Sequence, residues 1–507
     1  RTLASAILAW VLAVHMREVF VLRLPRPYAV QSPIAVSGAS HVRRNFFGQS
    51  GPPDLAEVAY LAPQWDELRA QLETLQTPEE KAFRENLAAG RGPPNAMANL
   101  RVFQKDASAA STVTLYRDSA SWCPYCHKVW LLLEEKQIPY TVKRVNMACY
   151  GEKPREFLDL QPNGQIPVAV IDKEVFRSSD AIIQNLLKRP GSSPSVDKAI
   201  DPFDHPQSVN LLRLERELFS QWLRWLCGGG GGRGSFEASL QKVEDALRRE
   251  DGPYFLGERF SLVDIMYTPF LERAVASLAY FKGFNIRDRT KYPAINAWFD
   301  AMETRPSYQA SKSDYYTHAH DLPPQLGGCN SERGGARAEA EVDGVAWNLP
   351  LRTDLIEPDW GWLSAAEARR EAAERLLHDP QAVALFATRG ASSPGFPPVW
   401  AELADPNAVP AKQWLPSVDV FLRHAAAMLL AGDAEAADAG DDTSPERAEA
   451  WAAVQQTVRS IPDGSREEIA KCVEYLQDRV GVPRDMSLPA ARRLRAELGK
   501  LMDALRA

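Results

Sequence analysis

Strand-like and helix-like patterns alternate between residues 111 and 190. Short runs rich in β-branched and aromatic residues predict strands, and longer runs with apolar residues at helical spacing predict helices. This succession of strand, helix, strand, hairpin and helix predicts an α/β domain. The predicted strands cover residues 113–116, 140–145, 165–171 and 174–176, and the predicted helices include residues 129–133 and 179–188.

The patterns of the remaining sequence are mainly helical. Residues 208–226 carry apolar residues on one broad helix face, and we expect Trp222 and Trp225 on that face to belong to the core. Ser261 and Asp264 have the spacing of a capping box, which predicts the start of a buried helix. Further predicted elements are a short strand at 345–350 and helices at 364–377, 419–430, 446–459, 466–480 and 489–506.

Changes in composition predict where the chain divides. Residues 191–195 and 322–337 are rich in Gly, Pro or Ser, as linkers are, and residues 432–444 have the acidic, alanine-rich composition of a disordered insert. The glycine run at 228–232 lacks the Lys-Ser/Thr pair of a phosphate-binding loop, so we expect a flexible connection. The predicted parts are a leader (1–50), an arm with short helices at 65–75 and 79–87 (51–110), the α/β domain (111–190), an all-α domain (201–320), a linker (321–341) and a mostly helical extension (342–507).

Composition narrows the classes of function. The chain has 507 residues, enough for two to four domains, and 45% of them are hydrophobic, which is ordinary for a globular protein. A net charge of −7 without a basic stripe argues against nucleic acid as the main partner. Six cysteines are few for this length, which favours a reducing compartment over a disulfide-stapled secreted protein.

The first fifty residues have the character of a targeting leader. The apolar run at 3–14 is too short for a convincing membrane span and suits the core of a signal sequence. The stretch that follows, to about residue 49, contains Ser, Arg and Pro but few acids, as transit peptides do. Together they predict a plastid protein that is not an integral membrane protein, with an untargeted disordered tail as the alternative.

The sequence Cys123-Pro124-Tyr125-Cys126 stands where a strand gives way to a helix. A cysteine at a helix N-terminus faces unpaired backbone N–H groups and the positive end of the helix dipole, and both favour the reactive thiolate. Cys123 is therefore a candidate nucleophile, with Cys126 one turn further on. Buried structural cysteines and half of a zinc site are the alternatives, but no second Cys or His pair follows at a suitable spacing, so we expect no metal.

The order of elements around this motif is thioredoxin-like. In that fold the proline before the third strand is usually cis and places the preceding backbone opposite the active cysteine. Pro167 stands at this position, so the fold predicts a cis bond between Ile166 and Pro167; an ordinary trans proline at a strand start is the alternative.

Several runs of sequence resemble the glutathione transferase superfamily, with a glutaredoxin-type motif in place of a serine or tyrosine. Residues 255–265, 292–298 and 305–306 are similar to the buried helix entry and late helices of its all-α domain. The resemblance is closest to the iota class of photosynthetic organisms, which also has a C-terminal extension. The segments similar to that class are 77–84, 116–119, 122–126, 128–136 and 475–492.

This resemblance implies glutathione-dependent thiol–disulfide exchange. Cys123 would attack a glutathionylated protein or a small disulfide and then carry glutathione, and a second glutathione or Cys126 would resolve that intermediate. A cysteine at this position favours reduction over the conjugation of electrophiles, and dehydroascorbate is a further candidate substrate.

The resemblance also implies a glutathione site. The backbone of Ile166 would pair with the cysteinyl part of glutathione, Ser179 would bind the γ-glutamyl carboxylate, and Lys153 the glycyl carboxylate. A solvated surface lysine is the alternative for Lys153. Relatives have Glu where this chain has Ser178, and Asp180 is a candidate substitute. The expected binding residues are Pro124, Tyr125, Lys153, Ile166, Pro167, Ser179 and Asp180.

Two other classes of function stay open. A glutaredoxin-type cysteine with glutathione as co-ligand could hold an iron–sulfur cluster between two subunits. Alternatively, the protein is a scaffold in which the extension is the working part and the redox site is residual. The only cysteine of the extension, Cys472, lies mid-helix without an activating histidine, so we expect a buried hydrophobe there and a role in partner binding or assembly. A homodimer is compatible with the sequence.

Overall fold

A five-stranded sheet forms the centre of the α/β domain in this computed structural model, which describes residues 59–92, 94–103, 111–228, 232–358, 360–393, 395, 401, 403–432 and 444–507. The sheet order is β1-β3-β2-β4-β5. β2 pairs parallel with β3 and antiparallel with β4, while β1 and β5 pair antiparallel at the two edges. The strands are β1 (Leu100–Arg101), β2 (Val113–Asp118), β3 (Tyr140–Val145), β4 (Val168–Ile171) and β5 (Glu174–Phe176).

The four predicted strands are confirmed, with two shifts of a boundary: β2 continues to Asp118 rather than ending at residue 116. β4 begins at Val168 rather than at residue 165, because Pro167 has no N–H to donate to a neighbouring strand. The peptide bond between Ile166 and Pro167 is cis, as the fold predicted. The sequence analysis missed β1, since two residues carry no readable alternation.

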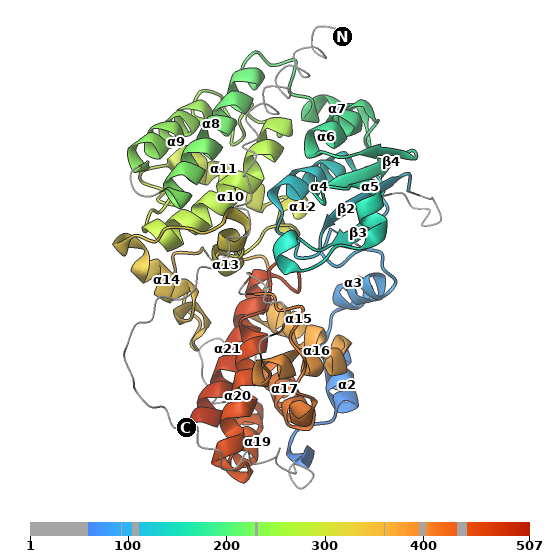
Figure 1. Cartoon of the computed structure of the whole chain (residues 1–507), viewed down its shortest axis with the longest axis vertical. Helices are drawn as coiled ribbons and strands as arrows, with labels where there is room; N and C mark the ends of the chain where they lie inside the picture. The colour runs from blue at the N-terminus through green and yellow to red at the C-terminus, as the bar shows by residue number, and fades with distance from the viewer. Residues whose placement is uncertain are drawn as a thin grey trace, which may run out of the picture. The chain divides into compact units, whose positions relative to one another are not determined.

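Helices cover this sheet and carry the predicted motif (Figure 1). α4 (Pro124–Lys136) begins directly after Cys123 and packs against α6 (Ser179–Lys188) and against α10 of the helical domain. Val129, Leu132 and Leu133 of α4 are completely buried, so the apolar run that predicted the helix is its core face. The other short helices here are η2 (Ala148–Tyr150) and α5 (Arg155–Leu160).

The all-α domain is built around α10 (Leu262–Lys282), which is buried along its whole length. The capping box between Ser261 and Asp264 is present, and Trp222 and Trp225 are core residues, as predicted. The surrounding helices are α7 (Pro194–Ile200), α8 (Ser208–Cys227), α9 (Arg233–Leu247), α11 (Pro293–Glu303), α12 (Pro306–Gln309) and α13 (Tyr315–Leu326).

The extension is helical, and the capping box at Ser364 that predicted its first long helix is present. The strand predicted at 345–350 is wrong. Val345–Trp347 forms a single 3-10 turn, because a short apolar run is equally compatible with a buried turn that packs on a helix. The helices are α15 (Ala365–His378), α16 (Pro380–Ala387), α17 (Leu415–Leu430), α19 (Pro445–Ser460), α20 (Asp463–Gln477) and α21 (Leu488–Arg506), with η5 (Thr388–Ala391) and η6 (Lys412–Trp414) between them.

The segment predicted as a linker has regular structure. It contains the end of α13, η3 (Arg333–Gly335) and α14 (Ala336–Val342), and η3 and α14 pack against α10. A Cβ on Gly335 would lie 2.2 Å from the carbonyl oxygen of Tyr280, so glycine permits this close approach of two backbones. Gly335 therefore serves packing, whereas a Cβ on Gly327 or Gly328 would meet no neighbour.

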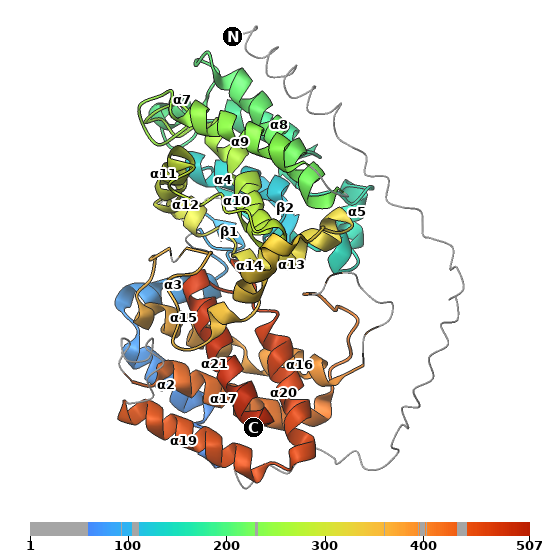
Figure 2. The same ribbon diagram turned by 90° about the vertical axis from the view of Figure 1, so that its left-hand side faces the viewer.

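The predicted arm helices are α2 (Trp65–Leu75) and α3 (Pro78–Ala88), preceded by η1 (Ala59–Leu61). α2 packs against α15 and α17 of the extension, as both views show (Figures 1 and 2). Leu68 and Leu72 belong to the extension's apolar core, and the Trp65 indole donates to Asp419 Oδ1 at 2.8 Å. The arm thus completes the core of the extension rather than standing apart from it.

The extension also contacts the all-α domain through buried polar groups. Arg495 Nη1 of α21 lies 2.7 Å from Asp314 Oδ2 at the start of α13, and both side chains are buried. The Tyr316 hydroxyl donates to the Asp478 carbonyl at 3.1 Å. α13 is therefore shared between the two helical parts.

Three parts of the sequence analysis concern residues outside the described ranges: the leader at 1–50, the centre of the glycine run at 228–232 and nearly all of the insert at 432–444. Among the described helices, none has both the length and the apolar character that a bilayer span requires.

Candidate active site

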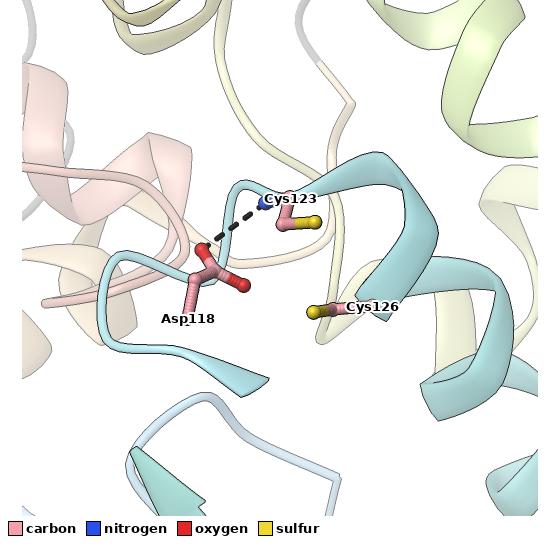
Figure 3. A group of neighbouring side chains, drawn as sticks. All are labelled: Asp118, Cys123 and Cys126. Atoms are coloured by element: carbon pink, nitrogen blue, oxygen red, sulfur yellow. Dashed lines mark hydrogen bonds between the residues drawn. The ribbon is translucent and has the colours of Figure 1, made fainter. Parts of the chain in front are cut away.

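Cys123 is the N-cap residue of α4, and Pro124 is the first residue of the helix (Figure 3). Proline favours this position because it fixes the backbone dihedral that a helix start needs and has no N–H to leave unpaired. Cys126 follows one turn later. Both thiols are free and buried, with 7% and 2% of the residue exposed, so the motif is a reduced dithiol beneath the protein surface.

Asp118 at the end of β2 is the third member of this group, and the sequence analysis missed it. Its Oδ2 accepts hydrogen bonds from the backbone N–H groups of Trp122 and Cys123, the latter at 3.1 Å. Its Oδ1 has no hydrogen-bond partner, although the residue is only 1% exposed. The two sulfurs and a carboxylate oxygen all lie within 4.8 Å of one another, so a buried carboxylate faces the dithiol. The only signal in the sequence was an acidic residue at the buried end of a strand.

The two cysteines differ in their environment. Burial raises the pKa of the Cys126 thiol well above its usual value, and a hydrogen bond to Cys123 and the nearby charge of Asp118 raise it further. Cys126 therefore keeps its proton at neutral pH and can donate a hydrogen bond to the Cys123 sulfur. A donated hydrogen bond stabilises a thiolate, which supports Cys123 as the nucleophile of the pair.

The same three groups could hold a metal ion, but the set is short of a structural zinc site, which takes four ligands. His127 does not supply the fourth, because its Nε2 is hydrogen-bonded to Ser311 Oγ at 2.9 Å on another side of α4. Burial lowers the pKa of His127 to about 3, so the ring is neutral and serves packing. The comparisons below give no support to an iron–sulfur cluster.

A buried polar chain holds the residue before the nucleophile. The Trp122 indole donates to His318 Nδ1 at 2.8 Å, and His318 Nε2 lies 2.8 Å from Glu272 Oε1. Burial lowers the pKa of His318, so the neutral ring accepts from Trp122 and donates to Glu272. Arg273 of the same helix as Glu272 donates to the Trp122 carbonyl. The loop that carries Cys123 is thus fixed to α10 and α13, and the analysis of the sequence gave no sign of it.

Lys153 lies near the dithiol. Its Nζ donates to the Asn146 carbonyl, and its side chain lies against the turn that leads to Pro167, where a Cβ on Gly164 would be 3.2 Å from Lys153 Cδ. Burial lowers the pKa of Lys153, while negative charge on the group formed by Cys126, Cys123 and Asp118 acts in the opposite direction. Lys153 is therefore not a solvated surface lysine, which was the alternative.

The predicted serine and aspartate lie at the first turn of α6. Ser178 is the N-cap residue, and its hydroxyl accepts from the Ala181 N–H at 3.2 Å. Ser179, the first residue of the helix, is buried. Asp180 Oδ1 accepts from the ammonium of Lys128 on α4 at 3.0 Å, so this carboxylate already has a cation partner.

Tyr125 is exposed and lies beside aromatic rings of the all-α domain. Its ring centroid lies 5.8 Å from that of Phe270. The guanidinium of Arg216 from α8 lies 4.6 Å from the ring centroids of both Phe219 and Phe270. Arg216 thus lies beside the Tyr125 ring of the motif, pairs with Glu215, and was not predicted.

Two family models match the chain. Residues 122–189 match the N-terminal domain of glutathione S-transferases, and residues 231–301 match their C-terminal domain. The thioredoxin-like sheet and the all-α domain described above therefore contain the segments that are similar to the two domains of glutathione S-transferases, as the resemblance implied.

Parts of the chain are also similar to individual proteins. The chain is 27% identical over 194 residues to glutathione S-transferase DHAR2 of Arabidopsis thaliana, a match that covers 38% of this chain and 84% of that protein. It is 25% identical over 214 residues to the disulfide-bond oxidoreductase YfcG of Escherichia coli, covering 36% and 88%. Glutathione transferase Omega 3C of Trametes versicolor is 29% identical, covering 41% of this chain and 88% of that structure, with a TM-score of 0.35.

Proposed function

We propose that the protein is a glutathione-dependent thiol–disulfide oxidoreductase of the cysteine type, which removes glutathione from proteins and reduces small mixed disulfides. The arrangement that carries the proposal is the reduced pair Cys123 and Cys126 at the start of α4, with the buried Asp118 beside it. The name of YfcG, a disulfide-bond oxidoreductase, supports the same class of reaction.

In the first step the Cys123 thiolate attacks the glutathione sulfur of a mixed disulfide. A bond forms between Cys123 and glutathione, and the bond between glutathione and the substrate breaks. The substrate leaves as a thiolate and takes a proton from solvent. The hydrogen bond from Cys126 supports this step because it stabilises the attacking thiolate.

The second step releases glutathione by one of two routes. A second glutathione thiolate can attack the bound glutathione sulfur and leave as oxidised glutathione, which regenerates the Cys123 thiolate. Alternatively, Cys126 attacks the Cys123 sulfur, glutathione leaves, and the resulting disulfide is reduced by further glutathione. The second route needs a base, because the raised pKa of Cys126 keeps its proton in place. Asp118 Oδ1, buried and without a hydrogen-bond partner, is the acceptor we assign.

Glutathione fits the residues around this pair. We infer that its cysteinyl part pairs with the backbone of Ile166 beside the cis Pro167, where an extended chain can lie against the start of β4. Lys153 would bind the glycyl carboxylate, and its position near the dithiol supports this. Ser179 at the first turn of α6 would bind the γ-glutamyl carboxylate, as helix N-termini do with anions. Asp180 is committed to Lys128, so its contribution to the γ-glutamyl ammonium would be shared with that lysine.

Further features of the proposal rest on the sequence. The Cys-Pro-Tyr-Cys motif together with the C-terminal extension assigns the chain to the iota class. The leader assigns it to plastids, and one relative is named a chloroplastic glutathione S-transferase. Dehydroascorbate is a second substrate that we propose for the same dithiol. We further propose a homodimer, and an extension that serves assembly or the choice of protein substrate.

The test is turnover of a small glutathione mixed disulfide by the mature protein and by two variants. Cys123→Ser should abolish turnover. Cys126→Ser should retain turnover at high glutathione if glutathione resolves the intermediate, and lose it if the dithiol route dominates. Cys472→Ala is the matched control, since Cys472 is a buried core residue of α20 and should leave turnover unchanged. Substantial turnover in Cys123→Ser would refute the proposal, and a full spectrum of the purified protein would reveal any cluster.

A further inference from the structure

A second pair of cysteines lies outside the active site. Cys227 is the last residue of α8, and Cys329 follows α13, a hundred residues later in the sequence. Their thiols lie within hydrogen-bonding reach of each other, and neither forms a disulfide. Nothing in the proposed thioltransferase reaction uses them.

The backbone around the pair is held in register by several contacts. The Asn330 N–H donates to the Leu226 carbonyl at 2.9 Å, and the Asn330 side-chain amide donates to the Cys227 carbonyl at 3.0 Å. These two bonds join Asn330, the residue after Cys329, to the last two residues of α8. Gly327 and Gly328 precede Cys329 with φ of +77° and +124°, which turns the chain back toward α8. The two thiols are therefore brought together by the fold rather than by chance contact of mobile side chains.

A second set of contacts places a cation beside the pair. The Trp225 indole donates to Glu332 Oε1 at 3.0 Å, and Lys282 Nζ lies 3.1 Å from the same oxygen. The Lys282 ammonium, at the end of α10, favours the thiolate form of both cysteines through its charge. A nearby cation supports thiol–disulfide exchange because the thiolate is the attacking form.

The two thiols have unequal roles. Cys227 is exposed, and its pKa is lowered, first by a hydrogen bond from Cys329. Cys329 is half-buried, and that same hydrogen bond raises its pKa. A hydrogen bond also joins the two thiols of Cys123 and Cys126, although both of those residues are buried. By contrast, burial raises the pKa of Cys149 and Cys472 to about 12.

We propose that Cys227 and Cys329 form a second redox-active dithiol, which oxidised glutathione or a similar small disulfide converts into an intramolecular disulfide. This site goes beyond the thioltransferase reaction and does not depend on it. Its product covalently joins the end of α8 to the segment after α13, the helix that holds His318 against Trp122.

The reaction balances as two exchanges. The Cys227 thiolate attacks one sulfur of oxidised glutathione, so that a mixed disulfide forms and one glutathione thiolate leaves. Cys329 then loses its proton and attacks the Cys227 sulfur, which forms the internal disulfide and releases the second glutathione. The two thiol protons pass to the two departing thiolates. The dithiol is oxidised by two electrons, and one oxidised glutathione becomes two glutathione molecules.

The experiment is differential alkylation of the full-length protein after exposure to oxidised glutathione, followed by peptide mapping by mass spectrometry. We expect one cross-linked peptide pair that contains Cys227 and Cys329, in protein that runs at the mass of a single chain on a denaturing gel without reductant. Cys329→Ser should instead accumulate glutathione on Cys227, and Cys227→Ser should leave Cys329 free. Cys472 should remain a free thiol during the exposure to oxidised glutathione and should be alkylated only after denaturation, which makes it the internal control for global unfolding.

A Cys123→Ser/Cys126→Ser double variant separates this site from the first. It should form the same cross-link, because the reaction needs no help from the active site. Three results would overturn the proposal. Cys227 and Cys329 could remain free thiols, and so be alkylated, when Cys123 and Cys126 are fully oxidised. The wild type could keep glutathione on Cys227 without closing the disulfide, or the cross-link could join two chains.

Discussion

Asp118→Asn tests the assignment of the base in the dithiol route. Asparagine has the same shape, and its carbonyl oxygen can accept the two hydrogen bonds that Oδ2 takes from the N–H groups of Trp122 and Cys123. The amide nitrogen then replaces Oδ1, so the change removes the proton acceptor and the charge while it keeps the loop anchored. The variant isolates the step in which Cys126 attacks.

The two effects of Asp118 on this step have opposite signs. Its charge raises the pKa of Cys126, so the loss of the charge alone would yield more Cys126 thiolate and faster release of glutathione. If Asp118 is the base, its loss should slow release by about 10²–10⁴-fold, since that is the usual contribution of a positioned base. This corresponds to about 2.7–5.4 kcal/mol of activation free energy. The direction of the change thus decides between the two roles.

The assay starts from protein that carries glutathione on Cys123, freed of excess glutathione, and follows its release by rapid acid quench at pH 7. Cys126→Ser sets the baseline without the dithiol route, and Asp172→Asn, which removes an exposed carboxylate paired with Arg189, controls for a general loss of charge. In Asp118→Asn the rate should rise steadily with pH, because hydroxide must then remove the proton. Release as fast as in the wild type, or faster, would show that Asp118 is not the base.

Three further predictions concern binding and stability. Ser179→Ala should weaken glutathione binding by about 1.5–3 kcal/mol if a charge-assisted hydrogen bond is lost, and an unchanged dissociation constant by calorimetry would place the carboxylate elsewhere. Arg495→Met should lower the free energy of unfolding by about 3–5 kcal/mol, because it leaves the Asp314 carboxylate buried without its cation. In urea titrations, the double variant Arg495→Met/Asp314→Asn should recover most of that loss. Equal losses in the single and the double variant would assign the effect to packing instead. Burial raises the pKa of Asp321 to about 8, so the folded state holds a proton that the unfolded state releases near pH 4. The free energy of unfolding should therefore fall as the pH rises from about 4 to about 8. Asp321→Asn should flatten that fall, and an unchanged pH profile of unfolding in this variant would contradict the reasoning.

The parts of the fold that could be predicted were those with local signals. The strands at 113–118 and 140–145, the capping boxes at Ser261 and Ser364 and the start of α4 are each encoded within a few residues of sequence. Periodicity and capping chemistry depend on neighbours, so the sequence displays them directly.

The support of the site could not be predicted, because its partners are distant in sequence. His318 lies 196 residues from the Trp122 indole that it binds, and neither residue differs by pattern from an ordinary core residue. Asp118 could not be predicted for another reason. Its importance comes from a buried carboxylate oxygen without a hydrogen-bond partner, which only the folded structure reveals. The helices within the predicted linker could not be predicted for a similar reason. Composition does not distinguish a flexible glycine from one, such as Gly335, that allows another backbone segment to approach closely.

The contact between α2 and the extension has a consequence for the order in which a growing chain can mature. Trp65 and its partner Asp419 are separated by 354 residues, so at a synthesis rate of about 5–20 residues per second the helix waits roughly 20–70 s for the surface it packs on. During that interval the sheet and the helices around α10 can already assemble, while Leu68 and Leu72 remain exposed to water and to chaperones. A part of the chain that is synthesised late therefore covers one of the first parts that the structure describes.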